Sequence, residues 1–107
     1  MRKETKKIAE AFARGQAAKA ARTETDGRTV WLHGNRIAQR EDDGSVWVTL
    51  AGWGTVTTRE RLNGICRELG TSFGFVQRDH SQRVIVDGAL LDVGEHDRVQ
   101  IIAGGAA

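Results

Sequence analysis

Residues 28–50 leave this chain few alternatives to a small antiparallel sheet. Three short segments with alternating apolar and polar residues cover Arg28 to His33, Arg36 to Glu41 and Ser45 to Leu50. The pairs Gly34-Asn35 and Asp43-Gly44 separate them, and Gly, Asn and Asp tolerate the positive φ that two-residue hairpin turns require. The sequence therefore predicts a three-stranded antiparallel meander.

The turn positions also predict the register of the meander. A loop at 34–35 sets Trp31 opposite Ala38, and a loop at 43–44 sets Trp47 opposite Arg40. Because side chains alternate along a strand, one face should be aliphatic and the other mixed. The predicted aliphatic face holds Val30, Leu32, Ile37, Val46, Val48 and Leu50, with Gln39 among them. The predicted second face holds Trp31, His33, Arg36, Ala38, Arg40, Trp47 and Thr49.

Three interpretations of this second face compete. In the first, a helix from the start of the chain covers it, with Ile8 and Phe12 packed over Trp31 and Trp47 and an arginine, Arg40, stacked on Trp47. In the second, the face is open and stacks the bases of single-stranded nucleic acid, since aromatic rings among arginines suit that ligand. In the third it binds a protein, because Trp and Arg are enriched at interface hot spots.

The start of the chain is strongly basic. Residues 1–22 hold seven basic and two acidic side chains, whereas the whole chain has a formal net charge of only +2. Alanines and good helix formers predict a helix over residues 3–22, weakened at Gly15. We therefore expect a basic helical arm over residues 1–24, a single α+β domain over residues 25–103 and a loose tail over residues 104–107.

A second helix is expected after the meander. Thr57 and Glu60 form a capping box, and an apolar stripe of Leu62, Ile65, Cys66 and Leu69 follows before Gly70 ends the helix. Cys66 in this stripe is expected to be buried, and Arg59, Arg61 and Arg67 are expected on the exposed side. Asn63 is a poor choice inside a helix, so we expect its amide to hydrogen-bond the loop Gly52 to Thr55.

The rest of the chain favours short strands. Residues 72–77 and 83–87 predict a hairpin, Asp87-Gly88 a tight turn into residues 89–91, and residues 98–102 a last strand. The predicted fold class is α+β: an N-terminal basic helix, a three-stranded antiparallel meander, a capped amphipathic helix, and three or four short antiparallel strands.

Several of these elements also resemble a known family. The runs Gly34-Asn35-Arg36-Ile37-Ala38, Ala51-Gly52-Trp53-Gly54-Thr55 and Thr57 to Asn63 are similar to the GNxIA and GW-T-TT-x-RLN elements of a family of small bacteriophage proteins. The resemblance covers roughly residues 25–80. It implies a phage or prophage origin and no particular activity. Frequent Ala, Gly and Arg, with no lysine after Lys19, favour a GC-rich host such as an actinobacterium.

Catalytic and export signals are largely missing from the sequence. The chain has no phosphate-binding loop, no HExxH motif and no nucleophile elbow, so we expect no enzyme and no cofactor. One weaker alternative is a metal site, if Asp79, His80, His96 and Asp97 come together. A single cysteine fits a reducing compartment, and no segment approaches the roughly 20 apolar residues of a membrane span. We expect a protein of the host cytoplasm.

The sequence therefore favours a binding protein. The first hypothesis is association with nucleic acid through the basic arm and the Trp/Arg face. Its candidate residues are Lys3, Lys6, Lys7, Arg14, Trp31, Arg36, Arg40, Trp47 and Trp53. The alternative is an inhibitor or adaptor that binds a host protein. A third possibility is a homodimer in which the stripe of Ile8 and Phe12 pairs across two N-terminal helices.

Overall fold

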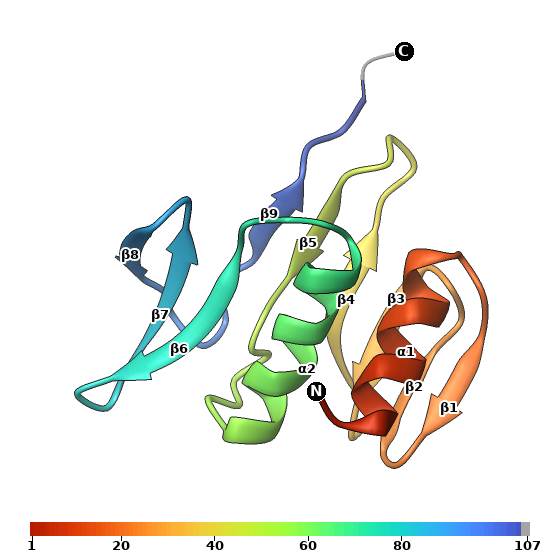
Figure 1. Cartoon of the computed structure of the whole chain (residues 1–107), viewed down its shortest axis with the longest axis horizontal. Helices are drawn as coiled ribbons and strands as arrows, with labels where there is room; N and C mark the ends of the chain where they lie inside the picture. The colour runs from red at the N-terminus through yellow and green to blue at the C-terminus, as the bar shows by residue number, and fades with distance from the viewer. Residues whose placement is uncertain (106–107) are drawn as a thin grey trace.

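The structure is a computed structural model that describes residues 1–105 (Figure 1). Within this range two helices, α1 (Lys3–Ala13) and α2 (Val56–Glu68), accompany two antiparallel sheets. The larger sheet contains β1 (Ala18–Ala20), β2 (Thr23–Thr25), β3 (Thr29–Leu32), β4 (Asn35–Arg40), β5 (Val46–Val48) and β9 (Val99–Ile102). The smaller sheet contains β6 (Gly74–Arg78), β7 (Ser81–Val86) and β8 (Ala89–Asp92). The predicted α+β class is confirmed.

The two helices lie on the same side of the larger sheet. This sheet has the order β1-β2-β3-β4-β5-β9, so the predicted meander β3-β4-β5 forms its middle. In Figure 1 both helices lie in front of it, and α1 contacts α2, β1, β2 and β3. The smaller sheet lies beside α2, which packs against β6. Strand β8 is an outer strand of the smaller sheet, and its outer edge pairs with no other strand within residues 1–105.

One hydrophobic core joins the helices to both sheets. Ile8 and Phe12 of α1 are buried against the aliphatic face of the larger sheet. Leu62, Ile65 and Cys66 of α2 belong to this core, and so does Phe75 of the smaller sheet. The predicted apolar stripe of α2 is thus confirmed. Because α1 supplies central core residues, it belongs to the same packed unit as the strands.

The prediction of a helix through residue 22 is wrong. The helix α1 ends at Ala13, where Gly15 adopts a left-handed φ of 69°. The backbone N–H of Gln16 donates to the carbonyl of Ala11, and that of Gly15 to Phe12, the pattern of a Schellman C-cap. Ala18 and Ala20 lie in β1, and the predicted boundary near residue 24 falls inside β2. In β1 and β2, the burial of alternate side chains favours strands over the helix that the propensity of alanine predicts.

The predicted register of the meander is also wrong. The tight turn is His33-Gly34, with φ of 52° and 78°, and Asn35 already pairs with Leu32 in β4. A bulge at residue 37 then places Ala38 opposite Val30 rather than Trp31. After the bulge Arg40 pairs with Val46, and Gln39 pairs with Trp47. Ala38 and Arg40 therefore lie on the helix side of the sheet.

The start of α2 differs from the predicted capping box. Thr55 is the N-cap, and its hydroxyl accepts a hydrogen bond of 3.1 Å from the backbone N–H of Thr58. The Glu60 carboxylate accepts instead from the backbone N–H of Arg2 and from the guanidinium of Arg61. Arg61 was expected to be exposed, yet it is buried because this ion pair and the hydroxyls of two threonines satisfy it.

Asn63 braces the smaller sheet rather than the loop before α2. Its amide donates to the Phe75 carbonyl at 3.0 Å and accepts from the Phe75 N–H at 2.6 Å. The predicted partner, the loop Gly52 to Thr55, is thus wrong. Asp79-His80 and Asp87-Gly88 form the tight turns of the smaller sheet. The predicted tail includes residues 106–107, which lie outside the described residues, while Gly105 N–H donates to the Asp43 carbonyl.

Candidate functional site

The face of the larger sheet that points away from the helices carries two tryptophans. Inward-pointing side chains of β2 and β3, such as Thr23 and Val30, are buried under α1, so their neighbours in sequence point outward. We call this outward side the open face. The cross-strand pairs define it as two rows: Lys19, Glu24, Trp31 and Arg36, then Gln39, Trp47 and Gln100.

Trp47 supports two arginines at one end of the open face. The guanidinium carbons of Arg36 and Arg98 lie 5.6 and 4.3 Å from the centre of its ring. Its indole N–H donates to a Glu41 carboxylate oxygen at 2.7 Å, and only 9% of the residue is exposed. The ring is thus a platform that holds two cations in place, through cation–π contacts, instead of a free stacking surface.

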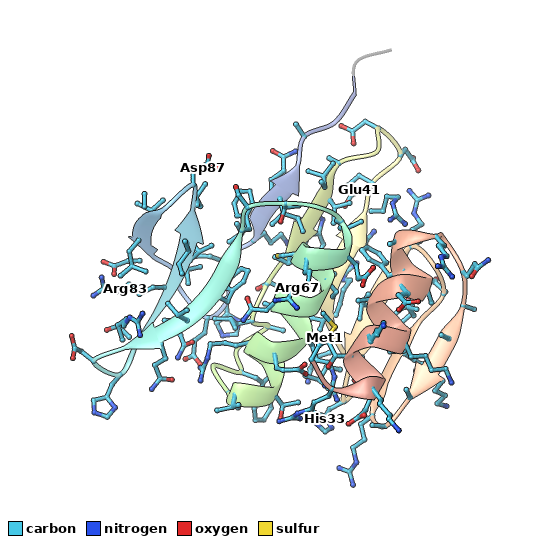
Figure 2. The ribbon with its side chains drawn as sticks, in the orientation of Figure 1. Met1, His33, Glu41, Arg67, Arg83 and Asp87 are labelled. Carbon is cyan, nitrogen blue, oxygen red and sulfur yellow. The ribbon has the colours of Figure 1, made fainter. Side chains whose placement is uncertain are left out.

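Trp31 lies in the row next to that of Trp47, on the side of the His33-Gly34 turn. Figure 2 shows His33 and Glu41 at opposite ends of the strands, and Trp31 is two residues from His33. The half-buried Trp31 lines a hollow of about 360 Å³ together with Lys19, Arg22, Glu24 and His33. We call it the Trp31 hollow. It joins an accessible aromatic ring to two cationic side chains.

Arg40 does not belong to the open face. Its guanidinium lies 4.5 Å from the centre of the Phe12 ring and donates to the carbonyls of Phe12 and Gly27 at 3.0 and 2.6 Å. The predicted stacking of Arg40 on Trp47 is therefore wrong, because the bulge at residue 37 turns Arg40 toward α1. Its contacts attach the C-terminal end of α1 to the sheet, which is a structural role.

The basic side chains of α1 and the tryptophans of the open face lie on opposite sides of the sheet. Lys3, Lys6 and Lys7 of α1 and its C-cap Arg14 are exposed. Ile8 and Phe12 point into the core, with 1% and 0% of each residue exposed. The interpretation that these two residues cover Trp31 and Trp47 is therefore wrong. The core of a single chain buries the stripe of Ile8 and Phe12 on which the third possibility, a homodimer, depends.

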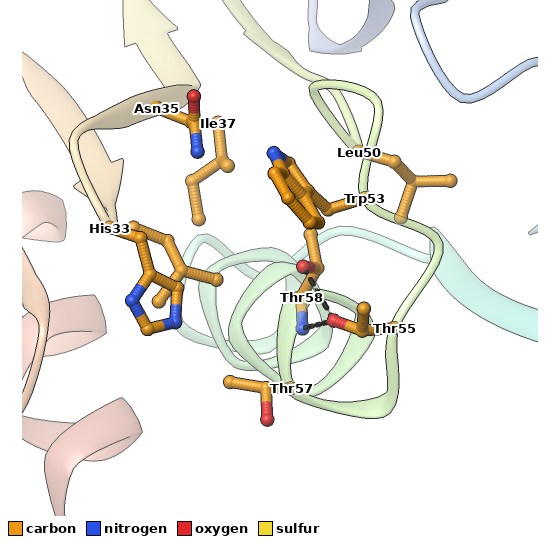
Figure 3. A pocket seen from close by; sticks show the side chains of 9 residues that line it. His33, Asn35, Ile37, Leu50, Trp53, Thr55, Thr57 and Thr58 are labelled. Atoms are coloured by element: carbon orange, nitrogen blue, oxygen red, sulfur yellow. Dashed lines mark hydrogen bonds between the residues drawn. The ribbon is translucent and has the colours of Figure 1, made fainter.

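Trp53 lies at the end of the sheet, where β3 and β4 meet the start of α2. This residue is 57% exposed and lines a second hollow, of about 400 Å³, which we call the Trp53 hollow. In Figure 3 its ring reaches from the loop before α2 toward Asn35 and Ile37. His33 lines both this hollow and the Trp31 hollow. The two hollows are therefore neighbours on either side of the His33-Gly34 turn.

The three histidines and the single cysteine lie in separate parts of the fold. Within residues 1–105, no three or more His, Cys, Asp or Glu side chains gather where they would hold a metal ion. His80 lies in the β6–β7 turn, whereas the His96 imidazole packs against the backbone of Gly52. Burial raises the pKa of the Cys66 thiol to about 11, so this thiol stays protonated and unreactive.

The sequence did not identify three cationic residues near the tryptophans of the open face as site residues. Lys19 and Arg22 were counted in a helical arm, although the alternation in Ala18-Lys19-Ala20 and Thr23-Glu24-Thr25 is a strand signal. Arg98 directly precedes β9, and nothing in the sequence links it to Trp47. Only the pairing of β5 with β9, strands about 50 residues apart, brings them together.

Among the described residues, no helix has the length and apolarity needed to cross a membrane.

Comparison with known proteins identifies one matching family model and no similar curated protein or solved structure. The family model described as Kyanoviridae Gp96 protein matches residues 1–101. Searches of the curated proteins and of the solved structures returned no match. The family match includes α1, which the resemblance seen in the sequence left out, and it covers nearly the whole packed unit. The chain therefore belongs to the Kyanoviridae Gp96 family of phage proteins.

Proposed function

We propose that this phage protein is a binding protein that takes single-stranded nucleic acid on its open face. One observation carries the proposal: Trp31 and Trp47 lie on the sheet face that neither helix covers, and two guanidinium groups lie over the Trp47 ring. The accessible ring of Trp31 can stack a base of any sequence, and the two arginines over the buried Trp47 ring can contact phosphates or stack on bases. An open antiparallel sheet is a common platform for this chemistry.

The charges of the open face support the same function. Lys19, Arg22, Arg36 and Arg98 supply four cations, while Glu24 lines the Trp31 hollow and Glu41 lies beside Trp47. The indole N–H of Trp47 occupies one Glu41 oxygen. A strand that runs from Trp31 toward Trp47 would meet cations at both ends. The α1 cations Lys3, Lys6, Lys7 and Arg14 are a separate surface, and we propose that they do not contact the bases.

Trp31 is the residue with which to test this function. We expect Trp31→Ala to weaken binding of a labelled single-stranded oligonucleotide, measured by fluorescence anisotropy, about tenfold or more, because one stacked base is lost. Trp31→Phe keeps an aromatic ring and should stay within a few-fold of the unchanged protein. Equal affinity of the Trp31→Ala variant, or no binding by the unchanged protein to either DNA or RNA, would overturn the proposal.

The salt dependence distinguishes the two basic surfaces. Removing one cation that contacts a phosphate lowers the slope of log affinity against log salt by about one. We expect this change for Lys19→Gln on the open face and none for Lys7→Gln, an exposed lysine on α1. The opposite result would place the phosphates along α1.

A second candidate function rests on β8. Leu90 and Leu91 are 42% and 52% exposed on a strand whose outer edge has no partner strand in the described part of the chain. Such an edge suits pairing with a strand of another protein, so a host-protein inhibitor or adaptor is the alternative. This alternative predicts that the protein captures a partner protein from host lysate and that the complex survives nuclease treatment. The variant Leu91→Lys should lose the complex. The complex should persist in Val56→Lys, a change at another exposed apolar residue.

The host and the compartment are part of the proposal. The chain's frequent Ala, Gly and Arg support a phage of a GC-rich, actinobacterial host. Its single cysteine, buried in the core, supports action in the reducing cytoplasm of that host.

A further inference from the structure

The Trp53 hollow has an apolar floor and a polar rim. Leu32, Ile37 and Leu50 form the floor, and each is at most 5% exposed. Asn35 and Thr57 lie on the rim, and no hydrogen bond among residues 1–105 uses their side chains. The hydroxyl of Thr55, in contrast, is occupied by the backbone N–H and the hydroxyl of Thr58. The hollow therefore presents an apolar space beside the unused amide of Asn35 (Figure 3).

The loop that carries Trp53 is held firmly although the ring itself is exposed. The Trp53 N–H donates to the Leu50 carbonyl at 2.9 Å. On either side, the N–H groups of Gly52 and Gly54 donate to the backbone carbonyl and the carboxylate of Glu95, at 2.8 and 2.7 Å. Arg59 donates to the Gly54 carbonyl at 2.9 Å. Because the backbone that carries the ring is already held, the loop loses little conformational entropy when a ligand stacks on Trp53.

We infer that the Trp53 hollow receives one unstacked nucleobase, which stacks on the Trp53 ring. This inference rests on the proposed function, because the base belongs to the strand bound on the open face. A base has a flat apolar surface and a hydrogen-bonding edge, which match the floor and ring of the hollow and the amide of Asn35. At about 400 Å³ the hollow is large enough for a single base.

The position of His33 supports a continuous path between the two hollows. This residue lines the Trp31 hollow on the open face and also the Trp53 hollow at the end of the sheet. A strand that leaves Trp31 therefore has only the His33-Gly34 turn to cross before it reaches Trp53. Lys19 and Arg22, beside Trp31, lie where the phosphates enter this path.

Photo-crosslinking tests this inference separately from the proposed function. The unchanged protein is irradiated with single-stranded oligonucleotides that carry 5-iodouracil at successive positions, and the crosslinked residues are identified by mass spectrometry. We expect one position to crosslink to Trp53 and another, nearby in the strand, to Trp31. Crosslinks at Trp31 without any at Trp53 would overturn the inference and leave the proposed function standing. Crosslinks at neither residue would overturn both.

Affinity measurements provide a second test. Trp53→Ala should weaken binding of the same oligonucleotide about tenfold, the effect of losing one stacked base. Val56→Ala is the matched control, because Val56 is 65% exposed in the same segment and does not line the hollow. Full affinity in Trp53→Ala, with weakened binding in Trp31→Ala, would show that the strand stays on the open face and never enters the Trp53 hollow.

Discussion

Gly64 sets how closely the two helices approach each other. A Cβ atom added there would lie 2.3 Å from Cγ2 of Thr5, so any side chain would push α1 away from α2. Although alanine usually stabilises a helix relative to glycine, we expect Gly64→Ala to lower the free energy of unfolding by about 1–3 kcal/mol. Urea denaturation measures this change.

Thr5→Ser provides the control for this contact. Serine lacks the methyl group that clashes but keeps the hydroxyl that bonds Glu60 and Arg61. The double variant Thr5→Ser/Gly64→Ala should therefore recover most of the lost stability. If Gly64→Ala alone were more stable than the unchanged chain, the close contact between the helices would not exist.

Glu60 should make the stability depend on pH. Burial alone would raise the pKa of this carboxyl, but hydrogen bonds from the Thr5 hydroxyl and the Arg2 N–H, together with Arg61, lower it below 4.5. A group with a lowered pKa stabilises the fold above its ordinary value and loses that effect as pH falls through the folded value. We expect Glu60→Gln to cost about 1–2 kcal/mol at pH 7 and less at an acidic pH well below 4.5, by urea denaturation. An equal cost at both pH values would contradict this.

At the scale of elements, Asn63 joins α2 to β6. Because its amide makes both hydrogen bonds to the Phe75 backbone, we expect Asn63→Ala to destabilise the protein by about 1–3 kcal/mol. Hydrogen exchange at the Phe75 amide should also accelerate. The control Asn35→Ala removes an amide without such bonds and should change stability by less than about 0.5 kcal/mol. Unchanged exchange at Phe75 would mean that β6 is held by packing alone.

The elements predictable from sequence are those determined by local signals. The meander, the apolar stripe of α2 and the turn at Asp87-Gly88 follow from periodicity and turn residues close in the chain. The bulge at residue 37 and the burial of Arg61 do not, because each depends on contacts with distant segments. The same limit applies to the candidate site. Trp31, Arg36 and Trp47 were identified on one face, whereas Arg40 was placed on the wrong side and Arg98 was missed.

At the scale of the whole molecule, α1 is part of the core and not a detachable arm. Deleting residues 1–14 would remove Ile8 and Phe12, two of the largest fully buried side chains. Truncating a single buried Phe to Ala costs about 3–5 kcal/mol, so we expect the shortened chain to lose cooperative thermal unfolding. Circular dichroism checks this. A shortened chain that melts cooperatively at the original temperature would show that residues 1–14 form an independent arm.

The larger sheet therefore separates two surfaces, the basic outer side of α1 and the open face with its tryptophans. The most direct test of the account is a two-dimensional NMR titration of the labelled protein with a single-stranded oligonucleotide. The three tryptophans give three indole N–H signals, and the α1 amides give a separate set. We expect the Trp31 and Trp47 indole signals to shift while the amides of Lys3–Ala13 stay in place. Shifts confined to α1, or no shifts at all, would contradict binding on the open face.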